Sequence, residues 1–174
     1  SPEVYRSFVF RICLLGGEST GKSTLSQALS QTLNAPYVAE FGREHWEAKN
    51  GVLEKDDLLH SAREQVRREE LACTAPYLVC DTSPLTTLFY MLDQFGSAPQ
   101  ELMALAERDY ALVVLCVDEF PFVQDGTRQG EAFRRRQQAW YEAELTQRKI
   151  PFLRVRGSLS ERIAQICQHI PWPG

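Results

Sequence analysis

The stretch RICLLGGESTGKSTLSQAL, residues 11–29, decides the fold, because an apolar run leads into a glycine-rich turn and a helical pattern follows the lysine. Gly16, four further residues and then Gly21, Lys22 and Ser23 fit the spacing G-x-x-x-x-G-K-[ST] between a strand and a helix. Glycines let backbone N–H groups approach an anion at a helix N-terminus, where the helix dipole also favours negative charge. The stretch therefore predicts a loop that binds phosphate groups.

We expect this loop to hold the phosphates of a nucleotide, with the ammonium of Lys22 between the β- and γ-phosphates. The hydroxyl of Ser23 is a suitable ligand for Mg²⁺ in such a loop. The sequence contains no N-K-x-D segment of the kind that reads guanine, so ATP with Mg²⁺ is expected rather than GTP. The predicted nucleotide-binding residues are Gly16, Gly17, Glu18, Ser19, Thr20, Gly21, Lys22, Ser23 and Thr24.

Four further apolar runs, each followed by a segment of helical period, indicate the rest of the fold. They are YVAEF (37–41), YLVCD (77–81), ALVVLCVD (111–118) and PFLRVRG (151–157). Continuous runs rich in Val and Leu are typical of strands buried on both faces of a parallel sheet. Alternating strands and helices predict an α/β fold with helices on both sides of the sheet. With 174 residues, we expect a single domain over 1–174.

Capping signals place the starts of several helices. Ser83 followed by Pro84 is an N-cap with proline at the first helical position, and Ser158 with Glu161 forms a capping box. Apolar residues at helical spacing predict further helices over about 55–72 and 131–148. The same spacing predicts that the buried face of the last helix is Leu159, Ile163, Cys167 and Ile170.

The composition excludes several classes of function. Nineteen basic and twenty-three acidic residues give a net charge of −4, which argues against a nucleic-acid partner. No apolar run approaches the eighteen or so residues that span a bilayer, so no membrane partner is expected. The five cysteines are scattered without a C-x-x-C pair and are read as buried thiols of a reducing cytoplasm. Nothing in the sequence indicates an oligomer, although one is possible.

Charged residues follow two of the predicted strands, at the sheet edge where open α/β folds bind their ligands. Asp81 is expected to orient Mg²⁺, and capping of the next helix is an alternative compatible with this role. Glu40 is expected to accept the proton of an acceptor hydroxyl or to bind a ribose diol. Arg43 is a candidate for binding the substrate or the transferred phosphate. For both Glu40 and Arg43 the alternative is an ordinary surface ion pair.

The segment 119–136 is expected to be a lid that carries arginines, because a closing lid excludes water and brings positive charge to a phosphoryl group. Arg128 is the first candidate for this role. Arg135 is the second, since neighbouring helical residues are about 100° apart and the run of arginines at 134–136 cannot all face one site. Trp46 is a candidate for stacking on a planar base, with helix packing as the alternative.

Taken together, LLGGESTGKSTL, EFGRE, CDTSPLTT and DGTR resemble the motifs of the ribosylnicotinamide kinase domain of bacterial NadR proteins, in the same order. The resemblance extends over about residues 9 to 157. The family's motifs G-G-E-S-[ST]-G-K-S, E-[YF]-G-R, D-T, T-T and D-G-x-R are matched by residues 16–23, 40–43, 81–82, 86–87 and 125–128.

The resemblance implies a P-loop nucleoside-kinase fold, a three-layer sandwich with a five-stranded parallel sheet and an arginine-bearing lid. It also implies an ATP- and Mg²⁺-dependent kinase that phosphorylates the ribose 5′-hydroxyl of nicotinamide riboside, giving the mononucleotide in NAD salvage. The family pattern has a tryptophan where this chain has Ala39, and D-T-D where this chain has Ser83 as the third residue. A kinase for another nucleoside or small metabolite and a nucleotide-dependent regulatory ATPase are the alternatives that stay open.

Overall fold

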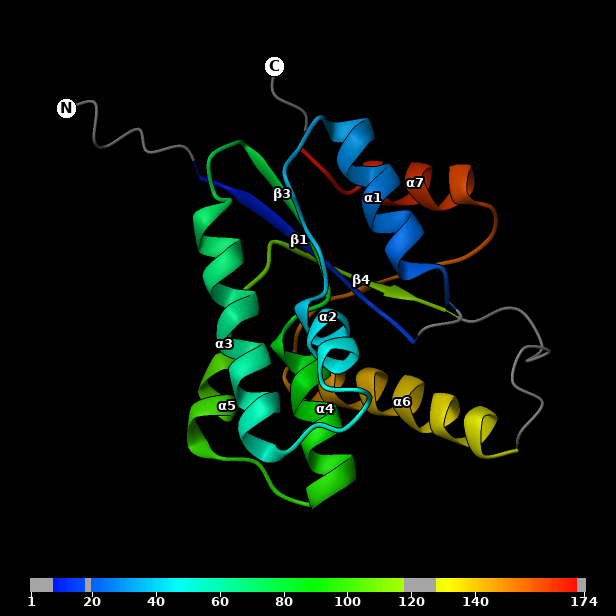
Figure 1. The fold of residues 1–174 in the computed structure, drawn as a ribbon. Coiled ribbons are helices and arrows are strands. Elements are labelled where there is room, and N and C mark those ends of the chain that lie inside the picture. The colour runs from blue at the N-terminus through cyan, green and yellow to red at the C-terminus, as the bar shows by residue number, and fades with distance from the viewer. Residues whose placement is uncertain (1–7, 18–19, 118–127, 172–174) are drawn as a thin grey trace.

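The computed structural model describes residues 8–17, 20–117 and 128–171, which form a sheet enclosed by helices (Figure 1). The strands are β1 (Phe10–Leu15), β2 (Tyr37–Val38), β3 (Tyr77–Asp81), β4 (Leu112–Cys116) and β5 (Leu153–Val155). The helices are α1 (Lys22–Leu33), α2 (Phe41–Ala48), α3 (Lys55–Leu71), α4 (Pro84–Phe95), α5 (Gln100–Leu105), α6 (Arg128–Gln147) and α7 (Leu159–Cys167).

The strands form one five-stranded sheet in the order β2-β3-β1-β4-β5, and every neighbouring pair is parallel. The predicted α/β fold with a five-stranded parallel sheet is therefore confirmed. Leu14 of β1 pairs with Asp81 of β3, so β3 ends level with the start of the glycine-rich loop. Because β3 lies between β1 and β2, the segments that follow these three strands are neighbours at the carboxyl edge. The single domain over 1–174 stays a prediction.

Side chains of the sheet alternate between two apolar layers, as the period of two in a β-strand requires. From β1, Ile12 and Leu14 are buried in a cluster with residues of α1 and α7. Cys13 and Leu15 point the other way, into a cluster with residues of α3, α4, α5 and α6. Figure 1 shows this layering, with α1 and α7 on one face of the sheet and α3, α4, α5 and α6 on the opposite face.

The predicted caps of two helices are present. The hydroxyl of Ser83 accepts a hydrogen bond from the N–H of Leu85 at 3.2 Å at the start of α4. At the start of α7, the Ser158 hydroxyl accepts from the Glu161 N–H at 3.1 Å, while the Glu161 carboxylate accepts from the Ser158 N–H at 3.2 Å. Both helices therefore begin where the sequence signals place them.

Two expectations about the ends of elements were wrong. The run 37–41 is a strand only over Tyr37–Val38, because the N–H of Phe41 donates to the side chain of Gln65 at 2.9 Å and α2 begins there. Glu40 thus precedes a helix instead of closing a strand. Of the expected buried face of the last helix, Ile163, Cys167 and Ile170 pack in the apolar layer, but Leu159 at the start of α7 is exposed. Arg162 and Ile166 of α7 are buried as well.

The longest described helix, α6, has 20 residues and carries charges along its length. In the part of the chain that the structure describes, no helix combines the length and apolar character needed to cross a membrane. The expectations of a cytoplasmic protein without a membrane partner go beyond this finding and stay predictions.

The capping box of α7 gives a test of the fold. We expect Ser158→Ala to lower the free energy of unfolding by about 1 kcal/mol, because the N–H of Glu161 loses its acceptor. Ser160→Ala, two residues further along the same exposed turn, is the matched control and should change stability by less than about 0.5 kcal/mol. Urea unfolding followed by circular dichroism measures both. Equal losses in the two variants would contradict the assigned cap.

Candidate active site

The glycine-rich loop is built at a close approach between the ends of two strands. A Cβ at Gly16 would lie 2.7 Å from Thr20 Oγ1 and 3.1 Å from the Cys116 carbonyl oxygen, so no larger residue fits there without displacement. Gly21 precedes α1 with φ 74°, a left-handed conformation that favours glycine. The Thr20 hydroxyl donates to the Gly17 carbonyl at 2.7 Å and closes the turn. Of the predicted loop residues, Glu18 and Ser19 lie outside the described residues.

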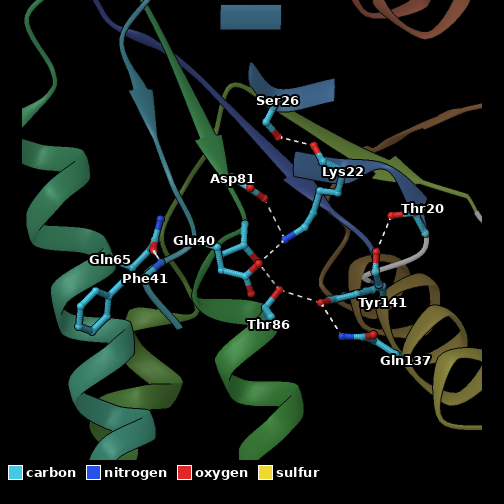
Figure 2. Close-up of polar contacts among 12 residues, drawn as sticks. Thr20, Lys22, Ser26, Glu40, Phe41, Gln65, Asp81, Thr86, Gln137 and Tyr141 are labelled. Atoms are coloured by element: carbon cyan, nitrogen blue, oxygen red, sulfur yellow. Dashed lines mark hydrogen bonds and ion pairs between the residues drawn. The ribbon is translucent and has the colours of Figure 1, made fainter. Parts of the chain in front are cut away.

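Lys22 lies between two carboxylates at the start of α1. Its Nζ is 2.9 Å from Glu40 Oε2 and 2.9 Å from Asp81 Oδ1, and Figure 2 shows the ammonium between the two acids. The residue is only 6% exposed. Burial by itself lowers the pKa of Lys22, but Glu40 and Asp81 outweigh burial and raise the pKa well above its ordinary value. Lys22 therefore stays positively charged at all physiological pH values.

The order of the strands explains why these three residues meet. Lys22 follows β1, Asp81 ends β3, and Glu40 lies two residues beyond β2, and these three strands are adjacent in the sheet. Asp81 is 1% exposed, and its Oδ2 accepts a hydrogen bond from the Tyr37 hydroxyl at 3.0 Å. Burial, followed by the charge of Asp81, raises the pKa of Tyr37 above its ordinary value, so this hydroxyl remains a donor. The carboxylate of Asp81 is thus fixed from two sides.

A cavity of about 560 Å³ extends from the glycine-rich loop to the surfaces of α2, α3, α4 and α6. Its far wall carries Tyr90 and Phe133, whose rings are stacked with centroids 6.0 Å apart and planes 24° apart. Arg134 and Asp93 lie on the same wall. The predicted site residues that line the cavity are Gly16, Gly17, Gly21, Lys22, Ser23, Thr24, Glu40, Arg43 and Trp46.

The lid arginines separate along α6 as the helical period requires. Arg135 lies away from the cavity, with its side chain 78% exposed and paired to Glu131 at 2.7 Å. Its neighbour Arg134 lines the cavity. The arginine of this run that lies on the cavity side of α6 is therefore Arg134, one residue before the expected Arg135. Arg128 is the first residue of α6, and its side chain lies outside the described part, as do residues 118–127 with the expected D-G turn.

Arg43 and Trp46 line the cavity from α2 but remain largely open to solvent. The Arg43 side chain is 61% exposed and lies 3.7 Å from Glu47, an ion pair of the kind that contributes little to stability. Trp46 is 52% exposed, and a Cβ at Gly51 would lie 3.1 Å from its ring. Both residues therefore lie at the mouth of the cavity, and their binding roles stay predictions.

A buried chain of hydroxyl groups next to Lys22 was not predicted from the sequence. The Thr82 hydroxyl donates to Thr86 Oγ1 at 2.6 Å. Figure 2 shows the continuation of this chain, in which Thr86 Oγ1 lies 2.7 Å from the Tyr141 hydroxyl and that hydroxyl accepts from Gln137 Nε2 at 3.3 Å. Burial raises the pKa of Tyr141 above its ordinary value. The ring of Tyr141 is buried in the apolar core, and a pattern of apolar residues gives no information on its hydroxyl.

Thr82 has an unusual backbone conformation for a β-branched residue. Its φ of 89° lies in the left-handed region, and its N–H donates to the Leu14 carbonyl at 3.0 Å. Such a conformation costs about 1–3 kcal/mol and persists where the surroundings hold it. The strained residue is also one of those that line the cavity.

The oxygen donors around the loop fit Mg²⁺. Ser23 lines the cavity, and the carboxylates of Asp81 and Glu40 contact Lys22, the residue before Ser23. Mg²⁺ takes hard oxygen ligands and is usually held by one or two protein groups together with substrate phosphates and water. Among the described residues, no group of three His, Cys, Asp or Glu side chains gathers in a way that could hold an ion. This donor set therefore fits a metal that is bound together with phosphates.

A parallel sheet whose first strand leads through G-x-x-x-x-G-K-S into a helix defines a P-loop nucleotide-binding protein. Residues 11–162 match the AAA domain family, and the chain belongs to it.

Curated relatives confirm the resemblance to NadR. The chain is 30% identical over 162 residues to the trifunctional NAD biosynthesis/regulator protein NadR of Escherichia coli, an alignment that covers 88% of this chain and 40% of NadR. It is 31% identical over 133 residues to NadR of Salmonella typhimurium, covering 72% of this chain and 32% of the relative. The chain thus spans less than half the length of these relatives.

Solved structures show the same fold. A crystal structure of NadR in complex with NR superposes with a TM-score of 0.75 at 20% identity, covering 93% of this chain and 52% of that one. Deoxyadenosine kinase from M. mycoides superposes with a TM-score of 0.66 at 14% identity, covering 91% of this chain and 97% of the kinase. The nucleoside-kinase-like fold implied by the motifs is therefore confirmed.

The buried ion pairs of Lys22 predict a loss of stability when the cation is removed. In Lys22→Met, the buried carboxylate of Asp81 and the carboxylate of Glu40 lose their partner, and we expect a loss of about 3 kcal/mol in the free energy of unfolding. Urea unfolding of the variant and of the wild type measures the difference. A variant as stable as the wild type would contradict the prediction.

Proposed function

We propose that the chain is an ATP-dependent kinase that phosphorylates the ribose 5′-hydroxyl of nicotinamide riboside. The observation that carries the proposal is the position of Glu40. Its carboxylate touches the lysine of the phosphate-binding loop and also lines a cavity large enough for a second ligand. A protein that only hydrolyses ATP has no need of such a cavity. The 30% identity to NadR, a protein described as acting in NAD biosynthesis, supports this substrate class.

In the proposed reaction, each charged group has a separate task. The loop N–H groups and Lys22 bind the β- and γ-phosphates, and the positive charge of Lys22 balances charge that develops during transfer. Glu40 accepts the proton of the attacking hydroxyl. Ser23 and Asp81 would hold Mg²⁺, which supplies charge neutralisation on the phosphate oxygens when bound. The aromatic and apolar walls exclude water, and this favours transfer to the ribose hydroxyl over hydrolysis.

The aromatic residues of the cavity are suited to a planar base. Ala39 is exposed and does not belong to the described cavity lining, so the tryptophan of the family pattern has no counterpart at that position. Trp46, Tyr90 and Phe133 line the cavity from α2, α4 and α6. A flat aromatic ring entering from the mouth would meet one of these faces. We propose that these helices take over base binding from the strand end.

A panel of acceptors tests the substrate. We expect ADP release in the presence of nicotinamide riboside at a rate at least about tenfold above that with adenosine, cytidine, thymidine or ribose, because only the correct base fills the aromatic end of the cavity. A coupled ADP assay measures the rates, and mass spectrometry identifies the phosphorylated product. Higher activity with another nucleoside would show that this nucleoside, and not nicotinamide riboside, is the substrate. ATP hydrolysis that no acceptor accelerates would count against a kinase altogether.

Glu40→Gln tests the proposed base. We expect kcat to fall by about 10²- to 10⁴-fold with little change in ATP affinity, since the amide keeps the shape of the side chain but cannot take the proton. Glu44→Gln is the matched control, because Glu44 lies on α2, the helix that Glu40 precedes, and is exposed and paired with Arg68. The kcat of this variant should stay at the wild-type value. Single-turnover kinetics measure the transfer step. A Glu40→Gln enzyme with normal kcat would remove Glu40 from this role.

Lys22→Met tests the phosphate-binding loop. We expect kcat/KM for ATP to fall by at least about 10²-fold, because the cation that binds and stabilises the transferred phosphate is lost. Lys49→Met is the control, since Lys49 is an exposed lysine that follows α2, pairs with Asp57 and does not line the described cavity. This variant should leave the kinetics unchanged. Equal effects of the two substitutions would contradict the assignment of the loop.

A further inference from the structure

Arg162 of α7 is a buried arginine that does not belong to the buried face predicted for this helix. It is 6% exposed, although arginine is rarely buried unless it is paired. In the described part of the chain, its contacts are with backbone carbonyls and not with a carboxylate. A buried cation to which the described residues offer three carbonyl groups needs a reason at this place in the fold.

The three contacts come from three segments at the carboxyl edge of the sheet. Arg162 Nη1 donates to the Thr20 carbonyl at 2.7 Å, Nε donates to the Gly157 carbonyl at 3.0 Å, and Nη2 donates to the Val117 carbonyl at 3.3 Å. Thr20 belongs to the phosphate-binding loop, Val117 follows β4, and Gly157 follows β5. The guanidinium therefore ties the loop to the ends of two strands on its far side.

The shortest of these contacts fixes the direction of a loop peptide. The described part of the chain contains no cis peptide bond, so the Thr20 carbonyl and the Gly21 N–H point in opposite directions across one planar unit. Because Arg162 holds the carbonyl toward α7, the N–H of Gly21 is directed away from α7. Gly21 lines the cavity, and an N–H so directed is a donor for an anion in the nest that starts α1.

Electrostatics gives Arg162 a second effect on the same ligand. Its positive charge lies behind the loop, opposite the side that faces the cavity. A phosphate bound in front of the loop offsets the cost of burying this charge, and the interaction is weakly screened because the site is buried. A lysine in this position has no fixed fork of donors and could not hold three carbonyls in this geometry.

We infer that Arg162 is a positioning residue for the phosphate-binding loop. Arg162 orients the Thr20–Gly21 peptide so that the Gly21 N–H faces the β-phosphate of a nucleotide. The inference rests on the nucleotide-binding part of the proposed function and not on the identity of the acceptor. Its effect should therefore depend on whether the ligand has a β-phosphate, and a general loss of stability would not produce that dependence.

The test compares ADP with AMP, both with Mg²⁺, by isothermal titration calorimetry. For Arg162→Gln we expect the Kd for ADP to rise about tenfold and the Kd for AMP to rise less than about twofold, because AMP places no β-phosphate in the loop. Arg162→Lys keeps the charge and should show an intermediate rise of about threefold to fivefold for ADP. It carries the test if Arg162→Gln does not fold.

Arg148→Gln is the matched control. Arg148 is also a part-buried arginine that donates to a backbone carbonyl, that of Ala106, but it directly follows α6 and makes no hydrogen bond or ion pair with the described residues of the loop. It should lower the melting temperature and leave both Kd values at the wild-type level.

Three results would overturn the inference: an unchanged Kd for ADP in the folded Arg162 variants, equal weakening of ADP and AMP, or a wild-type protein that does not bind ADP. A wild type that binds ADP but phosphorylates no acceptor would count against the proposed kinase alone and would leave the role of Arg162 in place.

Discussion

The contact of Lys22 with Glu40 and Asp81 is the interaction on which the rest of the site depends. An ammonium buried to this degree is stable only beside negative charge, and two carboxylates at 2.9 Å supply it. The same contact fixes the ends of β1, β2 and β3 relative to one another, because each of the three residues follows a different strand. The order β2-β3-β1 therefore brings the three charges together, in addition to packing the strands.

The parts of the fold that were predictable from the sequence are those that local signals determine. The run YLVCD is β3 residue for residue, since a strand buried on both faces has no polar position to interrupt it. Ser158 and Glu161 cap α7 because both partners lie within one helical turn. The loop from Gly16 to Ser23 was recognisable because its glycines answer a local steric need, seen in the 2.7 Å approach at Gly16.

The parts that were not predictable depend on which distant groups meet. The extended run 37–41 looked like a strand, but the side chain of Gln65, 24 residues away, accepts the N–H of Phe41 and starts a helix. The spacing on the last helix correctly assigned Ile163 and Cys167 to the core, but it included Leu159, which is exposed, and left out Arg162. Arg162 is buried where the carbonyls of Thr20 and Val117 accept its hydrogen bonds. A polar side chain can be buried where backbone carbonyls accept its hydrogen bonds. The pattern of apolar residues in the sequence does not show where such carbonyls lie.

The charges near the loop also constrain the form in which a nucleotide can bind. Lys22 carries one positive charge between two carboxylates, so this group of three residues has no positive charge to spare for a triphosphate. A free triphosphate would place like charges next to Glu40 and Asp81 in a site where screening by water is weak. A divalent cation held by Ser23 and Asp81 together with the phosphates would remove this conflict, because it would supply positive charge beside the carboxylates. Lys22 can then turn from the carboxylates to the phosphates without leaving either acid unbalanced. In the proposed function, a metal-bound nucleotide would take the place of Glu40 as partner of Lys22, and Glu40 would then be available to a second ligand.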